Sequence, residues 1–215
     1  MKGCRPLTTD EVRRIYEALG DNRWGPRDQA FFAVGISTGF RFTEVVTLKV
    51  GDVYANKAVM GHIRRPARIM KGKKRGRAVR VHPRCRAALR VWINQMIEIW
   101  GEPDKRYLHP KMYLFQSQEG SNRHLSYNRA RSMIKDAAQR AGIYEAPGLI
   151  GTHIMRKTYA NRVYEYFERE YLEGRSSTNP LVATQEALGH TSIAATQSYL
   201  SFRFSDVPES FVDVF

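Results

Sequence analysis

Gly and Pro residues divide most of this chain into segments with helical periodicity, and that pattern constrains the fold more than any other feature. The segment "LTTDEVRRIYEALG" opens with a capping signature, because Thr8 is followed three residues later by Glu11. Its apolar residues recur at helical spacing up to Gly20, where the helix is predicted to end. A second, mostly buried helix is predicted between Pro26 and Gly39.

One stretch between the helical segments has a different texture. "DVYANKAVMGHIRR", "ARIM" and "RAVRVHP" are short, rich in β-branched residues and separated by Gly, Pro or basic residues. They predict a small three-stranded antiparallel sheet, with "KGKKRG" as the turn between its last two strands. The fold class is therefore α+β but mainly α, a helical bundle with one small sheet. Further helices are predicted over "RFTEVVTLKV" and over residues 84–100, 125–141, 152–171, 181–188 and 192–200, with "MYLFQS" as a buried extended piece.

Composition limits the class of protein. The length of 215 residues suits one large domain or a domain with a small appendage, and 42% hydrophobic residues can bury a core. The sequence has no apolar run of membrane-spanning length and no apolar signal stretch after its basic N-terminus. Cys4 and Cys85 show neither metal-ligand spacing nor a disulfide framework. These features fit a reducing compartment and predict a cytoplasmic protein.

Charge gives the first indication of function. Lys and Arg total 35 against 21 Asp and Glu, a net charge of +14. The stretch Arg64–Arg80 concentrates basic residues and contains no acid. A generic basic surface, or binding to ribosomes or membrane surfaces, would also give such a balance. The concentration favours a polyanionic partner, and nucleic acid ahead of the other two.

Two motifs each place an arginine one helical turn from a polar partner. In "STGFRFTEVVTL", Arg41 stands at a helix start and Glu44 lies three residues on, so both occupy one face. In "GTHIMRKTYA", His153 and Arg156 are also three apart, and Thr152 can cap the helix. Each motif alone is common, since a surface Arg–Glu pair or a buried histidine explains it.

The segment "LGHTSIAATQSYL" holds a histidine and a tyrosine nine residues apart. Gly189 ends one helix, His190 lies in a tight connection, and Thr191 or Ser192 caps the next helix. Tyr199 then lies at an angle from which it can project toward a cleft. Because the chain has eleven tyrosines, packing is the ordinary role of Tyr199 taken alone.

In combination, these motifs resemble the tyrosine recombinase family, the phage integrase superfamily. Their order is an Arg with a Glu one turn on, a basic hairpin tip, an H-x-x-R helix, a G-H pair and a tyrosine. No single motif is specific, but five elements agree in type, order and rough spacing, from "LTTDEVRRIYEAL" to Tyr199. The resemblance implies the tyrosine recombinase catalytic-domain fold. It also implies a catalytic set of Arg41, Lys71, His153, Arg156, His190 and Tyr199, with Glu44 supporting Arg41.

The resemblance leaves two candidates for the hairpin lysine. Lys71 begins "KGKKRGR" and fits the end of the second strand. Arg77 resembles the arginine that opens the family's third strand, and counting back from it places the lysine between Lys71 and Lys73. We take Lys71 and keep Lys73 as the alternative.

The sequence departs from the family pattern in three places. Lys157 stands where many relatives have His, and "FEREYLEGRSSTNPL" is longer and more charged than the usual link. The sequence starts at the catalytic domain, so the N-terminal helical domain with which most relatives clamp DNA is expected to be absent. A natural short recombinase and a catalytic fragment both fit. We expect one catalytic domain over residues 1–204 and an apolar tail over 205–215 that docks on a neighbouring protomer rather than on its own domain.

Phosphodiester chemistry explains these residue types. Attack builds negative charge on the non-bridging oxygens, and two guanidiniums, Arg41 and Arg156, can each donate bidentate bonds to them. That stabilisation needs no metal or cofactor. A tyrosine hydroxyl needs help to attack at neutral pH, and by resemblance His153 gives that help while His190 bonds a phosphate oxygen. The hairpin lysine protonates the leaving 5′-oxygen, and a 3′-phosphotyrosine conserves the bond energy.

The expected partner is double-stranded DNA. We expect a homo-oligomer, a tetramer in the synaptic complex, and accessory DNA-bending or directionality proteins. Part of the basic charge is solvated surface, and part is expected to hold phosphates or read bases from helices in the major groove. The candidates for phosphates are Lys73, Lys74, Arg75 and Arg77, and those for base readout are Arg123, His124, Asn128 and Arg131.

The predicted function is site-specific DNA recombination in the cytoplasm, at the nucleoid when the protein is on DNA. The alternatives are a type IB topoisomerase-like nicking-closing enzyme and a non-catalytic DNA-binding regulator. The LGH-to-Tyr spacing and the Arg41 motif look more like a recombinase, and filled catalytic positions argue against a regulator. The resemblance does not distinguish integration from excision or inversion.

Overall fold

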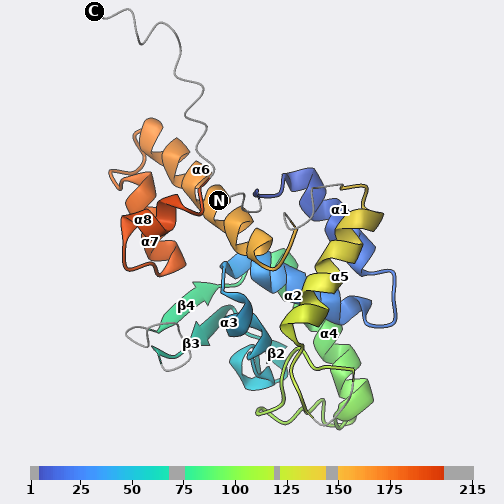
Figure 1. The fold of residues 1–215 in the computed structure, drawn as a ribbon. Helices are drawn as coiled ribbons and strands as arrows, with labels where there is room; N and C mark the ends of the chain where they lie inside the picture. The colour runs from blue at the N-terminus through green and yellow to red at the C-terminus, as the bar shows by residue number, and fades with distance from the viewer. Residues whose placement is uncertain (1–4, 68–75, 119–121, 144–149, 201–215) are drawn as a thin grey trace, which may run out of the picture.

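The computed structural model describes residues 5–67, 76–118, 122–143 and 150–200 (Figure 1). The described residues are mainly helical, with small antiparallel sheets, as predicted. None of the described helices is long and apolar enough to cross a membrane. The helices are α1 (Thr9–Leu19), α2 (Gly25–Thr38), α3 (Phe42–Val46), α4 (Pro83–Trp100), α5 (Tyr127–Arg140), α6 (His153–Leu172), α7 (Pro180–Leu188) and α8 (Ile193–Gln197), with a 3₁₀ turn, η1 (Val50–Asp52).

The strands form two antiparallel pairs. The strand β1 (Tyr54–Ala55) pairs with β2 (Ala58–Val59), and β3 (His62–Arg65) pairs with β4 (Arg77–Arg80). A single three-stranded sheet was predicted, whereas the described residues form two separate two-stranded ladders. The chain bends at Gly61, between the two ladders, and the Gly61 carbonyl accepts the Val81 amide beside the second ladder. "ARIM", the expected middle strand, lies outside the described residues from position 68 on.

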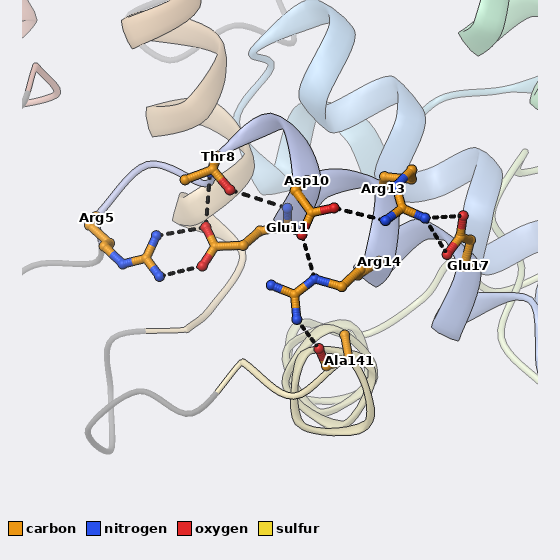
Figure 2. A network of polar contacts seen from close by, with 8 residues as sticks. All are labelled: Arg5, Thr8, Asp10, Glu11, Arg13, Arg14, Glu17 and Ala141. Atoms are coloured by element: carbon orange, nitrogen blue, oxygen red, sulfur yellow. Dashed lines mark hydrogen bonds and ion pairs between the residues drawn. The ribbon is translucent and has the colours of Figure 1, made fainter.

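The N-terminal helix forms as its sequence predicts. The Thr8 hydroxyl accepts the Glu11 amide at 3.2 Å, and the Glu11 carboxylate accepts the Thr8 amide at 2.9 Å, which completes a capping box (Figure 2). Arg5 donates two further bonds to Glu11. One turn along α1, Arg14 donates to the carbonyl of Ala141 at 2.6 Å. This bond ties α1 to the end of α5, against which α1 packs.

The central helix α2 organises the core. It packs against α1, α4 and α6, and its Phe31 and Phe32 are fully buried. Gly35 permits the approach of α6, because a Cβ at this position would lie 2.3 Å from the sulfur of Met155. A smaller apolar cluster around Leu188 joins α6 and α7 to the residues that directly follow α8. The α6–α8 unit is therefore attached to the rest of the molecule chiefly where α6 crosses α2 (Figure 1).

The "MYLFQS" segment is buried at its centre, as predicted, but it is not a regular extended strand, because isolated bridges at Tyr113 and Gln116 are separated by bends. Leu114 and Phe115 are fully buried, and their backbones bond to those of Leu48 and Leu125. The indole of Trp92 in α4 donates to the Leu114 carbonyl at 2.7 Å. The segment thus fixes α4 against the turn that follows α3.

Candidate active site

The site begins where α2 ends. Gly39 adopts the left-handed conformation with φ of 59°, which turns the chain sharply into Arg41 and α3. A side chain at Gly39 would also collide with the ring of Tyr159, since a Cβ would lie 2.2 Å from its Cδ1. Gly39 is therefore required both for its backbone conformation and for the close approach of α6.

Arg41 and Glu44 form the predicted pair, and the carboxylate holds both ends of the arginine. The Arg41 amide donates to Glu44 Oε2 at 2.8 Å, and the guanidinium donates to Oε1 at 3.1 Å. Glu44 is buried, whereas the Arg41 side chain is 25% exposed. Glu44 therefore caps α3 and orients Arg41, whose remaining donors are accessible from outside.

Arg156 lies in the first turn of α6 and is only 1% exposed. It donates to the carbonyl of Gly39, to the carbonyl of Leu188 at 2.9 Å and to Nε2 of His190 at 2.8 Å. Burial, followed by the charges of Arg41 and Arg77, lowers the pKa of Arg156 to about 10, so the guanidinium stays charged at neutral pH. One buried cation thus joins the end of α2, the end of α7 and the histidine that follows α7.

The two bonds of His190 define its tautomer. Because a guanidinium only donates, Nε2 accepts from Arg156, and the proton resides on Nδ1. Nδ1 lies 3.0 Å from the hydroxyl of Thr196, which is fully buried in α8. Burial, then the charges of Arg156, Arg41 and Arg77, lowers the pKa of His190 to about 4. His190 is therefore neutral at pH 7.

Tyr199 stands just after α8. Ser192, one of the two predicted caps, starts this helix by accepting the Ala195 amide at 3.3 Å. The Tyr199 ring is half-buried, with its centroid 5.2 Å from that of His190 and 5.4 Å from the guanidinium carbon of Arg156. The short helix thus brings the tyrosine ring beside the histidine and the buried arginine.

His153 opens α6 and is exposed, one turn before Arg156. Partial burial, then the charges of Arg156, Arg41 and Lys157, lowers its pKa. The prediction that Thr152 caps this helix through its side chain is wrong. Thr152 has helical backbone angles, with φ of −61° and ψ of −23°, and its hydroxyl makes no cap bond. An extended backbone is the conformation that aims a capping hydroxyl at the helix.

Arg77, one of the predicted phosphate ligands, is half-buried, and its guanidinium contacts groups of the protein itself. Its Nη2 donates to the Thr38 carbonyl at 2.5 Å, and its guanidinium lies 5.0 Å from the Phe40 ring and 5.7 Å from the Tyr159 ring. Burial lowers its pKa. Arg77 therefore joins the first residue of β4 to the turn that carries Arg41.

A second buried arginine was not foreseen from the sequence. Arg65, directly opposite Arg77 in the ladder, is 1% exposed and bonds Asp52 at 2.8 Å and Thr47 at 2.6 Å. The available signal was alternation, since Ile63 and Arg65 occupy the buried face of β3. Arg65 and Arg77 thus attach the base of the β3–β4 hairpin to the segments that follow and precede α3.

The other predicted site residues lie around the start of α5 or outside the described residues. Arg123, His124, Asn128 and Arg131 are exposed, at or just before the start of α5. Lys71, Lys73, Lys74 and Arg75 lie outside the described residues, as does the 205–215 tail. Within the described ranges, no group of three or more His, Cys, Asp or Glu could hold a metal. Burial raises the pKa of Cys85 to about 12, so it stays a thiol.

Comparisons with known proteins agree with the geometry. A sequence model described as the phage integrase family matches residues 5–205. Tyrosine recombinase XerC 1 of Ralstonia nicotianae is 29% identical over 210 residues, covering 93% of this chain and 57% of its own length. The chain spans a little over half the length of such curated relatives.

Solved structures show the same fold. A crystal structure of XerA recombinase superposes with a TM-score of 0.68 at 23% identity, covering 99% of this chain and 65% of that chain. XerH recombinase, in a post-cleavage complex with its palindromic difH substrate, gives 0.63 at 22% identity, covering 97% and 52%. The fold is thus that of tyrosine recombinase catalytic domains, and the match over residues 5–205 shows that the chain belongs to the phage integrase family.

Proposed function

We propose that this chain is the catalytic domain of a site-specific DNA recombinase that cuts and rejoins strands through a 3′-phosphotyrosyl intermediate. The observation that carries the proposal is the convergence of Arg41, Arg156, His190 and Tyr199 from distant segments, with His153 on the same helix turn as Arg156. The related proteins named tyrosine recombinases support it.

In the proposed mechanism, the two arginines hold the scissile phosphate. Arg156 is positioned by two carbonyls, and Arg41 is positioned by Glu44. Because the protein fixes both guanidiniums beforehand, little reorganisation is needed as charge grows on the non-bridging oxygens. The fixed geometry of each fork also suits bidentate bonding to a phosphate.

His190 has a role that depends on the arrival of the phosphate. Without DNA, Nε2 accepts from Arg156, and burial together with neighbouring cations lowers the pKa of His190 and keeps the ring neutral. A bound phosphate offers Arg156 a better acceptor and brings negative charge close to the ring. Both effects favour protonation of Nε2 and donation to a phosphate oxygen. The Thr196 hydroxyl holds the other nitrogen throughout.

Bond making and breaking then involve three further groups, which are Tyr199, His153 and the hairpin lysine. The Tyr199 oxygen attacks phosphorus, and His153 accepts the phenolic proton as the new P–O bond forms. The bond from phosphorus to the 5′-oxygen breaks, and the hairpin lysine protonates that oxygen. We assign this role to Lys71, with Lys73 as the alternative. Arg77 and Arg65 support the assignment, since they anchor the hairpin base beside Arg41.

The partners and architecture belong to the same proposal. Double-stranded DNA is the substrate, bound by a homo-oligomer that forms a tetramer in the synaptic complex, with accessory proteins that bend DNA or set direction. Residues 1–204 act as one catalytic domain, and the 205–215 tail docks on a neighbouring protomer. The net charge of +14 supports DNA as the partner, and the protein would act in the cytoplasm at the nucleoid.

The proposal is tested with a duplex that carries a nick near the scissile phosphate, so that a short fragment leaves and cleavage becomes irreversible. Repeated sequences in the DNA that flanks the gene supply candidate recombination sites. Wild type is expected to form a covalent protein–DNA adduct without added metal, and Tyr199→Phe is expected to bind equally but form none. Tyr166→Phe, an exposed tyrosine on α6, is the matched control. Tight binding by wild type with no adduct would contradict catalysis.

A further inference from the structure

A cavity of about 120 Å³ lies between the β1–β2 hairpin, α4 and the loop that follows α4. Single waters need roughly 10–15 Å³ by the same measure, so the space admits a group of several heavy atoms. In Figure 1, β2 and α4 lie on the far side of α3 from α7 and α8, so the cavity is separate from the Tyr199 cluster. Its polar lining residues are Tyr54, Lys57, Arg86, Arg90, Asn94 and Arg106.

The lining carries four positive charges and no acidic residue. Arg86 and Arg90 lie one turn apart on α4, an arrangement of like charges that disfavours the helix unless an anion binds there. The Nε of Arg86 is buried without a hydrogen-bond partner in the structure. A buried donor of this kind favours an acceptor supplied by a ligand.

Two of the lining cations lie in tight turns of the backbone. Four non-glycine residues in the described ranges have positive φ: Asn56, Lys57, Arg106 and Asn122. Asparagine tolerates this region, but lysine and arginine do so at a cost. Lys57, with φ of 59°, and Arg106, with φ of 50°, are the two that are not asparagine, and both line this cavity. Lys57 takes this conformation in the two-residue turn between β1 and β2, and Arg106 takes it in the turn closed by the Glu102–Tyr107 bridge. The two turns thus place one cation each at the edge of the cavity.

We propose that this cavity binds a backbone phosphate of DNA, outside the segment held by the Tyr199 cluster. The inference rests on the proposed DNA-binding function and adds a second anchoring point to it. The four cations supply the donors, and Tyr54 and Asn94 hold Arg106 in place through its carbonyl at 3.2 Å and its guanidinium at 2.8 Å. Anchoring a flanking phosphate fixes the register of the duplex without reading sequence.

Lys57→Gly gives the sharpest test, because it removes a charge and relieves strain together. Asn-Gly is the preferred pair for a tight hairpin turn with positive φ, so this variant should melt at the same or a higher temperature than wild type. It should nevertheless bind a long duplex more weakly, with the slope of log affinity against log salt reduced by about one. Arg86→Gln should reduce the slope similarly.

Arg13→Gln is the matched control, an exposed arginine on α1 that is absent from the cavity. An equal loss of slope in this control, or no loss in Lys57→Gly, would overturn the proposal. Titration with inorganic phosphate tests whether the ligand of the cavity is free phosphate or a phosphate of the DNA backbone. If phosphate stabilises wild type but not Lys57→Gly while DNA slopes are unchanged, the assignment to DNA is overturned. Covalent adduct formation at saturating DNA should persist in Lys57→Gly, which distinguishes failure here from failure of the proposed function.

Discussion

Arg156 donates a hydrogen bond to the carbonyl of Gly39, 117 residues earlier in the chain. Through this bond, the helix that begins at His153 is fixed against the turn that carries Arg41. The same guanidinium reaches the Leu188 carbonyl and His190. The Arg156 side chain therefore helps to position Arg41, His153 and His190. Its loss should affect folding as well as chemistry.

Replacement of Arg156 by Met should lower the free energy of unfolding by about 3 kcal/mol, because it leaves buried carbonyls without donors. Arg156→Lys should recover part of that loss but not the fork geometry, so adduct formation should stay at least about 100-fold slower. Denaturant unfolding and adduct kinetics measure the two effects. Arg169→Met, exposed on the same helix, should change stability by less than about 0.5 kcal/mol. Equal effects at the two arginines would show that Arg156 is not an anchor.

Gly39→Ala should destabilise the protein more than Gly174→Ala does. Both glycines have positive φ, so each substitution incurs backbone strain of about 1 kcal/mol. An added Cβ meets nothing within 4 Å at Gly174 but collides with Tyr159 at Gly39, which adds about 1–3 kcal/mol. Thermal unfolding of the two variants isolates the close approach of α6 to the α2–α3 turn. Equal shifts in melting temperature would mean that this approach is not tight.

His190 should remain neutral at pH 6 in the free protein, protonated on Nδ1. Nitrogen NMR of the labelled histidine should show a pKa near 4, compared with about 6.5 in an unfolded chain. Because the folded pKa is the lower one, the unfolded state binds more protons between these values. The contribution of His190 to stability is thus complete above pH 6.5 and is lost as pH falls toward 4. Titration of His190 near 6.5 would contradict the bond from Arg156.

The features that could be predicted from the sequence are those that depend on neighbouring residues. Helix starts and stops depend on neighbouring residues, so the Thr8–Glu11 capping box and the turn at Gly39 could be predicted. The side-chain cap predicted for Thr152 was wrong, because residue type alone does not fix the backbone angles, which at Thr152 are helical.

The inward orientation of two arginines could not be predicted from local sequence. Arg65 and Arg77 lie in a strongly basic stretch that is typical of a surface, yet Arg65 is buried and Arg77 is half-buried, and both bond to groups elsewhere in the chain. The Asp52 carboxylate and the Thr38 carbonyl become their partners only once α2 and η1 have packed. The motif order predicted which residue types form the site, but their distances depend on this packing.

Arg77→Met tests whether Arg77 supports the protein or contacts DNA. If it supports the α2–α3 turn, stability should fall by about 1–3 kcal/mol, while the salt dependence of DNA binding stays unchanged. Arg80→Met, exposed on the same strand, is the control for stability. A slope reduced by about one with unchanged stability would instead make Arg77 a phosphate ligand.

The central claim is that Tyr199 carries the DNA. The adduct formed on a nicked duplex can be digested with protease and nuclease, and the residue that retains the phosphoryl group can be located by mass spectrometry. The account predicts a phosphotyrosine at Tyr199, joined to the 3′ end of the cleaved strand. A phosphoryl group on any other residue, or a link to a 5′ end, would contradict it.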